Sequence, residues 1–330
     1  RSIWVTGVQT CALPIFIDAE VKALRQAIDT RFPDTRNFVL DVSRDGQKVL
    51  ISSYSDVRPS RYRLVDLSGK AVIELGQSAP ELASAALAPM KTVSVPGPEG
   101  IRIPGYLSLP QGEPKNLPAV VLPHGGPHAR DSWGYDALVQ LLTSRGYAVL
   151  QLNFRGSTGY GSEWYDAGWQ GWGTVMHDDI TAGARWLVLQ GIADAKRLCI
   201  VGWSYGGFAA LVGAMKEPDL YRCAVSIAGV TDIADLQWDW HASFYGGRAA
   251  ARAITGTDRE QMDAISPRRH AERIRIPVLL VHGQLDNTVP PDHSTHMAKA
   301  LARARVPHEL LMVEEDRKST RLNSSHPYRS

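Results

Sequence analysis

The stretch that most constrains this chain is residues 197–215, RLCIVGWSYGGFAALVGAM. An apolar, β-branched run at 198–201 leads into GWSYGG, and apolar residues then recur at helical spacing from Phe208 to Met215. This order predicts a strand, a sharp turn and a helix, with Ser204 on the turn. Flanking glycines let such a strand and helix pack closely while the serine hydroxyl stays exposed above the sheet. Ser204 is therefore the predicted nucleophile; a chance G-x-S-x-G in a glycine-rich loop is the alternative.

Alternating strands and helices are predicted from about Lys91 onward. The expected strands are 92–95, 101–109, 119–123, 148–153, 198–201, 224–228, 278–281 and 309–313. Helical spacing of apolar residues lies between them, at 138–142, 176–187, after Ser204 and at 297–304. This alternation predicts an α/β fold, namely an α/β-hydrolase fold whose mostly parallel sheet has helices on both faces. Catalytic groups are then expected at the carboxyl ends of the strands.

The region before the α/β part has a different pattern. A short helix is expected at 17–30, followed by four alternating runs at 38–42, 49–54, 62–67 and 71–75. Turn-like sequences separate the runs, so they predict an up-and-down meander like one blade of a β-propeller. The predicted division is a propeller remnant of about one blade over 16–90 and a hydrolase domain over 91–315.

Both ends of the chain look foreign to the fold. The peptides VTGVQTCALPI, from Val5, and DRKSTRLNSSH, from Asp316, are encoded by opposite strands of one DNA oligonucleotide that resembles a sequencing-library adapter. We therefore assign residues 1–15 and 316–330 to adapter-derived tails and expect the natural segment, from about Phe16 to Glu315, to be a fragment of a longer gene. A signal peptide is the competing interpretation of the N-terminus, but its basic region is nearly absent.

Composition excludes several classes of partner. The formal net charge is +2, but the two tails contribute +1 and +3, which leaves −2 for the remainder. Neither nucleic acid nor an anionic membrane surface is an expected partner, and no apolar run is long enough to span a membrane. Of the three cysteines, Cys199 and Cys223 fall in apolar strand-like runs and are expected to be buried thiols, with no disulfide framework.

Two further segments supply the expected partners of the serine. Asp286 follows the buried-type strand at 278–281 and comes after Ser204 in sequence, as the acid of a hydrolase triad does. There it would accept the imidazole N–H of a histidine, although it could also merely close a turn. His124, Gly125 and Gly126 follow another strand, where backbone N–H groups, with that of Tyr205, would form an oxyanion hole; a plain tight turn is the alternative.

Aromatic residues after the strand at 224–228 suggest a substrate pocket. Trp240 and Tyr245, together with Val289, are assigned to substrate binding, but core or lid packing explains the aromatic residues equally well. His293 and His296 lie one helical turn apart without a further ligand cluster, so no metal site is predicted. No cofactor is expected either, because the glycine-rich loop at 153–161 lacks the lysine of a phosphate-binding loop and is interpreted as shaping the site.

Four sequences, PHGGPHARD, NFRGSTGYG, GWSYGGFAAL and HGQLDNTVP, together resemble the prolyl oligopeptidase family of serine peptidases, in particular its acylaminoacyl-peptidase and dipeptidyl-aminopeptidase-like branch. The resemblance runs from about Asn37 to Glu315. It implies a β-propeller joined to an α/β-hydrolase domain that cleaves short peptides, with the propeller restricting entry. It also implies that Ser204 is the nucleophile, Asp286 the triad acid, and Tyr205 and the segment 124–126 the oxyanion region.

The chain departs from the family at the third triad member. In the family a histidine follows the last strand in a Glu-Asp-His-like sequence, whereas here Glu315 and Asp316 are followed by Arg317. A guanidinium stays protonated at neutral pH and cannot act as the general base. His326 lies inside the adapter-like peptide and is not expected to serve. The parent protein is thus predicted to be a serine peptidase, and this fragment is predicted to be nearly inactive.

Other functions stay open at this point. The same serine turn serves carboxylesterases, and a noncatalytic binding domain on a hydrolase fold is a third possibility. The blade-like region favours a peptidase acting on short peptides. The sequence leaves oligomeric state and compartment open, with a cytoplasmic location favoured.

Overall fold

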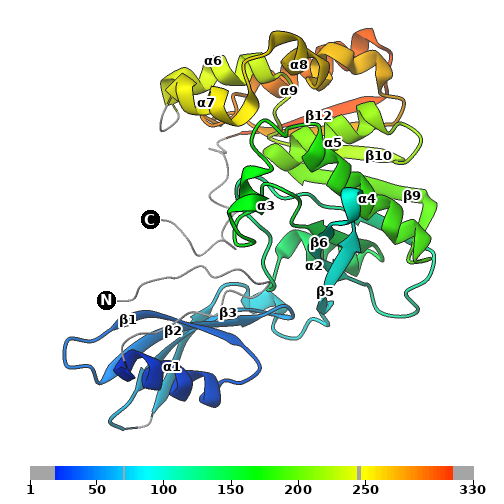
Figure 1. Cartoon of the computed structure of the whole chain (residues 1–330). Helices are drawn as coiled ribbons and strands as arrows, with labels where there is room; N and C mark the ends of the chain where they lie inside the picture. The colour runs from blue at the N-terminus through cyan, green and yellow to red at the C-terminus, as the bar shows by residue number, and fades with distance from the viewer. Residues whose placement is uncertain (1–18, 70, 244–246, 315–330) are drawn as a thin grey trace.

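The structure is a computed structural model that describes residues 19–69, 71–243 and 247–314. Two β-sheets dominate it, a four-stranded sheet near the N-terminus and an eight-stranded sheet in the rest of the chain. Figure 1 shows the smaller sheet, in blue, as a lobe beside the larger α/β part. The assignments of 1–15 and 316–330 to foreign tails, and of Tyr245 to substrate binding, fall outside the described residues.

The small sheet is an antiparallel meander in the order β1-β2-β3-β4, as predicted. It follows helix α1 (Ala19–Arg31) and consists of β1 (Arg36–Val42), β2 (Lys48–Ser55), β3 (Arg58–Asp66) and β4 (Val72–Gln77). Ile28 of α1 clusters with buried residues of β2 and β3, so the helix covers one face. Apolar side chains such as Ile73 and Leu75 are exposed on β4. These features are consistent with one blade of a β-propeller.

The large sheet has the strand order β12-β11-β10-β9-β7-β8-β6-β5. Its strands are β5 (Met90–Pro96), β6 (Arg102–Ser108), β7 (Leu117–Val121), β8 (Ala148–Leu152), β9 (Ala193–Trp203), β10 (Cys223–Ile227), β11 (Val278–Gly283) and β12 (His308–Val313). The pairs from β12 through β8 are parallel, whereas the β8–β6 and β6–β5 pairs are antiparallel. All eight predicted strands are present, and the prediction of a mostly parallel sheet is confirmed.

Helices cover both faces of the large sheet. They are α2 (Ala137–Ser144), α3 (Ser162–Asp166), α4 (Val175–Leu189), α5 (Tyr205–Lys216), α6 (Ile233–Ser243), α7 (Gly247–Thr255), α8 (Arg259–Ala264) and α9 (Asp292–Arg303), with short 3₁₀ turns η1 (Pro80–Leu82), η2 (Pro98–Gly100) and η3 (Pro267–Arg273). Alternate residues of β7 enter two separate cores: Ala119 and Val121 join the one built with α4, α5 and α9, and Val120 the one built with α2. This is the period-two alternation expected of a strand covered on both sides.

Buried hydrogen bonds join the small sheet to the α/β part. Asp56, in the β2–β3 turn, accepts a hydrogen bond from Met90 N at 2.8 Å through Oδ2. Gln140 of α2 donates to Asp56 O at 3.1 Å and to Ala88 O at 2.8 Å, and its Oε1 accepts from Ala88 N. The predicted boundary at 90/91 thus falls at the beginning of β5, where these contacts fasten the two sheets together. Among the described residues, no helix is both long and apolar enough to cross a membrane.

The expectation of two buried thiols is wrong for Cys199 and Cys223. These residues are opposite each other in the parallel pair β9–β10 and form a disulfide. Both are partly exposed rather than fully buried. The sequence pattern placed each cysteine on a strand, but it carried no information on the register of those two strands, which brings the sulfur atoms together.

His177 of α4 is a buried histidine that gives the fold a pH dependence. Its Nε2 lies 3.2 Å from Thr181 Oγ1, and Nδ1 has no hydrogen-bond partner among the described residues. Burial lowers the pKa of His177 to about 3, and the charges of Lys216 and Arg185 act in the same direction. Because the unfolded chain binds this proton at a higher pH than the native chain does, stability is lost as pH falls from about 6.5 toward 3.

We expect this one histidine to contribute about 2 kcal/mol to the loss of unfolding free energy between pH 7 and pH 5, since each pH unit in the window costs about 1.4 kcal/mol. In His177→Gln, which cannot titrate, the difference between the two pH values should be smaller by that amount. Urea unfolding of both proteins at both pH values measures it. An identical pH dependence in the variant would show that the proton uptake occurs elsewhere.

Candidate active site

Ser204 occupies the turn between β9 and α5 with a strained backbone. Its φ of 57° and ψ of −117° lie in a region that residues with a Cβ rarely adopt. The turn is held on both sides, because Ser204 N donates to Ile227 O at 2.8 Å and Phe208 N donates to Ser204 O at 3.1 Å. The predicted strand, sharp turn and helix are therefore present, with the serine at the carboxyl end of a central strand.

Glycines are required around this turn by close backbone packing. A Cβ on Gly202 would overlap Gly206 O, and a Cβ on Gly206 would overlap Pro123 O. Any side chain at either position would push α5 away from β9 or from the end of β7. These contacts explain physically why the stretch reads G-x-S-x-G, and they bring the segment after β7 against the serine turn.

The segment after β7 lies directly beside the serine. A Cβ built on Gly125 would be 3.4 Å from Ser204 Cβ and 3.1 Å from Trp203 O, so the backbone of this glycine lies close against the serine turn. Gly126 has a φ of 124° and precedes a cis peptide bond to Pro127. Tyr205 is the first residue of α5, where a backbone N–H has no acceptor within its own helix. The backbone of the segment after β7 and the beginning of α5 thus both lie next to Ser204.

Two hydrogen bonds and a stacking contact hold the ring of His124 in place. Its Nδ1 lies 2.8 Å from Gly125 O and its Nε2 2.8 Å from Ser157 Oγ, while the ring stacks on Phe154 with centroids 4.3 Å apart. This arrangement fixes the loop to the segment 154–157 of the glycine-rich region. His124 therefore positions the loop, and any oxyanion contact from it would come from the backbone.

The side chain of Tyr205 is part of the core. It is 1% exposed, its hydroxyl donates to Met176 Sδ at 3.2 Å, and its ring packs edge-on against Trp172. Burial raises the pKa of this phenol well above its usual value. The residue can thus contribute its N–H to the site, while its side chain anchors the beginning of α5.

Asp286 lies in the turn after β11 and keeps one carboxylate oxygen without a hydrogen bond. Oδ1 accepts from Thr288 N at 2.8 Å and from Val289 N at 3.1 Å. Oδ2 is buried and has no hydrogen-bond partner among the described residues; His282 Nε2 lies 3.7 Å from it. A buried carboxylate oxygen without a partner is costly unless another group pairs with it.

The end of β12 lies beside this aspartate. Gly283 pairs with Val313 in the parallel register of β11 and β12, and Gln284 N donates to Val313 O at 2.9 Å. Asp286 N in turn contacts Gly283 O at 3.3 Å. The chain therefore leaves the sheet after Val313 at a point beside the Asp286 turn. Glu314 is the last residue that the structure describes.

Two histidines near Asp286 are already held by other groups. His282 Nε2 lies 2.8 Å from Val289 O and its Nδ1 2.7 Å from Ser294 Oγ. His293 Nδ1 accepts from Thr231 N at 3.1 Å, and its Nε2 is 3.5 Å from Asp239 Oδ2. Both rings are buried. These contacts fix both rings within the structure.

The three residues assigned to substrate binding stay predictions. Tyr245 is outside the described residues, and the side chain of Trp240, on α6, is not described. Val289 is 1% exposed and belongs to the main core, next to the Asp286 turn. A neighbouring aromatic residue, Trp238, is 72% exposed and lines a pocket of about 200 Å³ with Pro290.

The glycine-rich segment 153–161 is fastened by an ion pair that the sequence did not reveal. Arg155 binds Asp179 of α4 through its backbone N–H and through its guanidinium, with Nη2 2.8 Å from Oδ1, and it also reaches Glu99 at 3.1 Å. The side chain of Asp179 is 0% exposed. No local pattern links positions 155 and 179, so only the fold could identify this pair.

The loop after the glycine pair carries a carboxyl group in an unusual environment. Asp131 contacts Asn153 through its backbone N–H and carbonyl, and its Oδ2 has no hydrogen-bond partner among the described residues. Burial, and then the nearby Asp136 charge, raise the pKa of Asp131 well above its usual range. In the sequence, the only indication that Asp131 belongs to the site was its place in the motif PHGGPHARD.

The sheet order and the strained serine between β9 and α5 define an α/β hydrolase. A sequence model of the prolyl oligopeptidase family matches residues 133–325, more than half of the chain. The chain belongs to the prolyl oligopeptidase family of serine peptidases. The match extends beyond the described residues and includes positions 316–325, which the sequence analysis assigned to a foreign tail.

Individual relatives agree with this membership. Dipeptidyl aminopeptidase BIII of Pseudoxanthomonas mexicana is 34% identical over 274 residues, covering 79% of this chain and 40% of the relative. The acylamino-acid-releasing enzyme of Homo sapiens is 31% identical over 207 residues, covering 59% of this chain and 28% of the relative. This chain therefore spans well under half the length of these relatives.

Solved structures show the same fold. A puromycin-hydrolyzing peptidase of Mycobacterium tuberculosis superposes with a TM-score of 0.75 at 32% identity, covering 83% of this chain and 43% of that chain. A puromycin hydrolase gives a TM-score of 0.74 at 26% identity, covering 84% of this chain and 43% of that chain. The expected α/β-hydrolase peptidase fold is confirmed.

Proposed function

We propose that the protein containing this chain hydrolyses short peptides through an acyl-enzyme formed on Ser204. The observation that carries the proposal is the strained backbone of Ser204 at the β9–α5 turn. Such strain persists only where the surrounding structure enforces it, and it is concentrated at functional sites. Asp286 is proposed as the triad acid, and the backbone of Tyr205 and of the segment 124–126 as the oxyanion hole.

The proposed steps use the groups around the turn. Ser204 Oγ attacks the scissile carbonyl carbon while a histidine removes its proton. The carbonyl oxygen becomes an oxyanion, which the N–H of Tyr205 and a backbone N–H beside Gly125 would stabilise. The histidine then protonates the leaving amine, and water releases the acyl group by the reverse sequence. Asp286 would accept the second ring N–H and stabilise the imidazolium.

The histidine is proposed to follow β12. This is supported by Asp286 Oδ2, which is buried without a hydrogen-bond partner among the described residues, and by the end of β12 beside it. In this sequence Arg317 stands where the family has the histidine. We therefore propose that the 330-residue chain is nearly inactive, with a rate reduced by about 10⁴- to 10⁶-fold, as when one triad member is removed.

The proposed substrates are short peptides with a free or an acylated N-terminus. The proposal is supported by the relatives, which are named as a dipeptidyl aminopeptidase and as acylamino-acid-releasing enzymes. The four-stranded sheet joined to the α/β part through Asp56 and Gln140 also supports a peptidase over an esterase, because a propeller limits access to short substrates. Dipeptidyl and N-acylaminoacyl reporter substrates, compared with simple esters, would distinguish these activities.

A fluorophosphonate probe tests the proposal at the serine. The test compares the 330-residue chain with a full-length form that has histidine in place of Arg317, and each with its Ser204→Ala variant. We expect rapid labelling of Ser204 in the full-length form only, since nucleophilic attack requires the general base. Peptide mapping by mass spectrometry identifies the labelled residue.

Three results would contradict different parts of the proposal. Rapid labelling of Ser204 in the 330-residue chain would show that the missing histidine is not needed, and the proposed inactivity would be wrong. A folded full-length form that is not labelled, or that is labelled equally after Ser204→Ala, would refute Ser204 as the nucleophile. Hydrolysis of esters without any peptide cleavage would favour the carboxylesterase alternative.

A further inference from the structure

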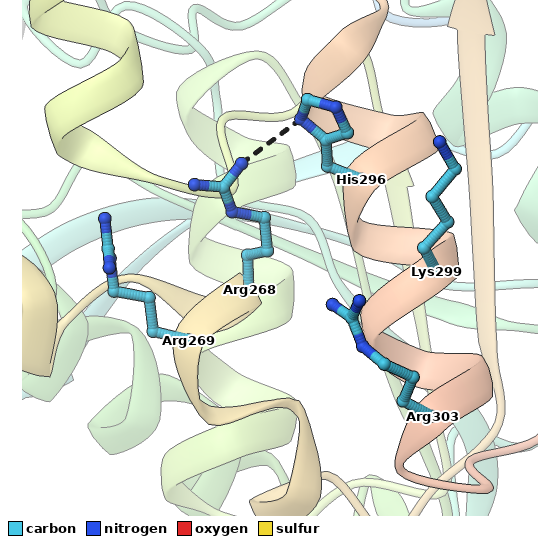
Figure 2. Close-up of a pocket in the computed structure, with 5 residues that line it drawn as sticks. All are labelled: Arg268, Arg269, His296, Lys299 and Arg303. Atoms are coloured by element: carbon cyan, nitrogen blue, oxygen red, sulfur yellow. Dashed lines mark hydrogen bonds between the residues drawn. The ribbon is translucent and has the colours of Figure 1, made fainter.

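A pocket outside the candidate active site is lined only by basic side chains. It has a volume of about 300 Å³ and lies between η3 and α9. Figure 2 shows its five lining residues, Arg268, Arg269, His296, Lys299 and Arg303. None of them belongs to the proposed catalytic groups. The pocket is therefore a separate feature of the surface.

The two arginines of η3 already have carboxylate partners. Arg268 binds Asp232 at 2.6 Å and Asp235 at 2.7 Å. Arg269 binds Asp232 at 2.8 Å and Asp263 at 3.0 Å. These pairs fix both guanidinium groups at the edge of the pocket. Their charges are largely compensated, so they supply rigid hydrogen-bond donors more than free charge.

The two cations of α9 are different. Lys299 and Arg303 are exposed, and neither forms an ion pair with a carboxylate in the described part of the chain. With His296 they recur at the i, i+3, i+7 spacing that aligns side chains on one helix face. In Figure 2, His296 and Arg303 extend toward the side of η3, and the Lys299 side chain runs along α9 between them. Two uncompensated positive charges therefore lie on one wall of the pocket.

His296 adds a donor to the same wall. Arg268 Nη1 lies 3.2 Å from His296 Nδ1, and because a guanidinium only donates, the Nδ1 of His296 must accept. The ring proton is then on Nε2, which is left to donate. The pocket thus offers guanidinium, ammonium and imidazole donors, but no aromatic or aliphatic lining residue and no acidic one.

We propose that this pocket binds a compact anion with two or more negative charges on oxygen, of the phosphate or polycarboxylate class. The guanidinium fork of Arg303 matches the geometry of such oxyanions, and the anion would supply the counter-charge that Lys299 and Arg303 lack. The volume admits a ligand larger than a single phosphate. The absence of aromatic and aliphatic residues from the lining argues against a ligand that needs a stacked ring or a buried hydrocarbon.

Isothermal titration calorimetry with the 330-residue chain at constant ionic strength tests this proposal. Inorganic pyrophosphate and citrate are the two probes, and they separate the phosphate source from the carboxylate source. We expect saturable binding of one anion per chain by at least one probe. In the double variant Lys299→Gln/Arg303→Gln we expect the Kd to rise at least about tenfold, which corresponds to about 1.4 kcal/mol.

Two matched variants make the result specific. Lys115→Gln/Arg145→Gln removes the same net charge from exposed positions outside the pocket, and it should leave the Kd unchanged. Lys299→Arg/Arg303→Lys keeps both charges and should retain binding within a few-fold. Glutamine preserves helix propensity on the exposed face of α9, and circular dichroism checks that each variant is folded.

The proposal is overturned by any of three results. The first is the absence of saturable binding by both pyrophosphate and citrate. The second is equal weakening in the Lys115/Arg145 variant, which would mean that the anions respond only to net charge. The third is unchanged affinity in folded Lys299→Gln/Arg303→Gln. Loss of peptidase activity plays no part in this test, so it stands independently of the proposed function.

Discussion

Replacing Ser204 with alanine is expected to lower kcat/KM for a peptide substrate by about 10⁴- to 10⁶-fold in the full-length form that carries a histidine after β12. The hydroxyl is the proposed nucleophile, and without it only the oxyanion donors and substrate binding contribute to the rate. Steady-state hydrolysis of a dipeptidyl or acylaminoacyl reporter measures the effect. Ser226→Ala is the matched control, because this buried serine lies on the adjacent strand β10 and its hydroxyl has no hydrogen-bond partner among the described residues.

The control should retain activity within a few-fold. Comparable activity in Ser204→Ala and the unsubstituted protein would remove Ser204 from the mechanism. Equal losses in Ser204→Ala and Ser226→Ala would indicate that the loss comes from disturbance of the sheet and not from chemistry at the nucleophile.

Two substitutions of Ser204 that both remove the hydroxyl also measure the backbone strain of the turn through its effect on stability. Glycine adopts the backbone conformation of Ser204 without the steric cost that a Cβ imposes, whereas alanine keeps that cost. We therefore expect Ser204→Gly to be more stable than Ser204→Ala by about 1 kcal/mol, after the entropic penalty of glycine in the unfolded chain. Urea unfolding of the two variants of the 330-residue chain measures the difference. Equal or reversed stability would mean that the turn is not strained.

The serine turn could be predicted because all its determinants are local. The apolar run before Ser204, the glycines around it and the helical spacing from Phe208 lie within one continuous stretch. The same holds for the strands, whose ends in the structure differ from the predicted ends by a few residues. Placing Ser204, Asp286 and the 124–126 segment at carboxyl ends of strands follows from the α/β pattern alone.

Features that depend on pairing between distant segments could not be predicted. The Cys199–Cys223 disulfide requires the register of β9 against β10, and the Arg155–Asp179 pair requires α4 to lie under the glycine-rich segment. The basic pocket forms only because η3 lies beside α9 in the folded structure. The sequence after Asp232 contains aromatic residues, but helices α6, α7 and α8 were not predicted from it. Local sequence propensity contains no information about any of these contacts.

Replacing Gly206 with alanine is expected to destabilise the chain by about 3 kcal/mol. The added Cβ would overlap Pro123 O, a backbone atom that cannot move aside without shifting either α5 or the end of β7. Since interiors are close-packed, either shift disturbs the surrounding core. The strain also falls at the junction of the serine turn and the 124–126 segment, so the full-length form should lose activity as well. Urea unfolding measures the first effect.

Gly76→Ala is the matched control for this prediction. A Cβ at Gly76, on β4 of the small sheet, would meet nothing within 4 Å, and its backbone needs no left-handed conformation. Because the substitution adds the same methyl group without overlap, its unfolding free energy should change by less than about 1 kcal/mol. If Gly206→Ala were as stable as Gly76→Ala, α5 could not be packed against Pro123 as closely as described. The proposed oxyanion donors would then not lie next to Ser204, and the proposed catalytic geometry would be wrong.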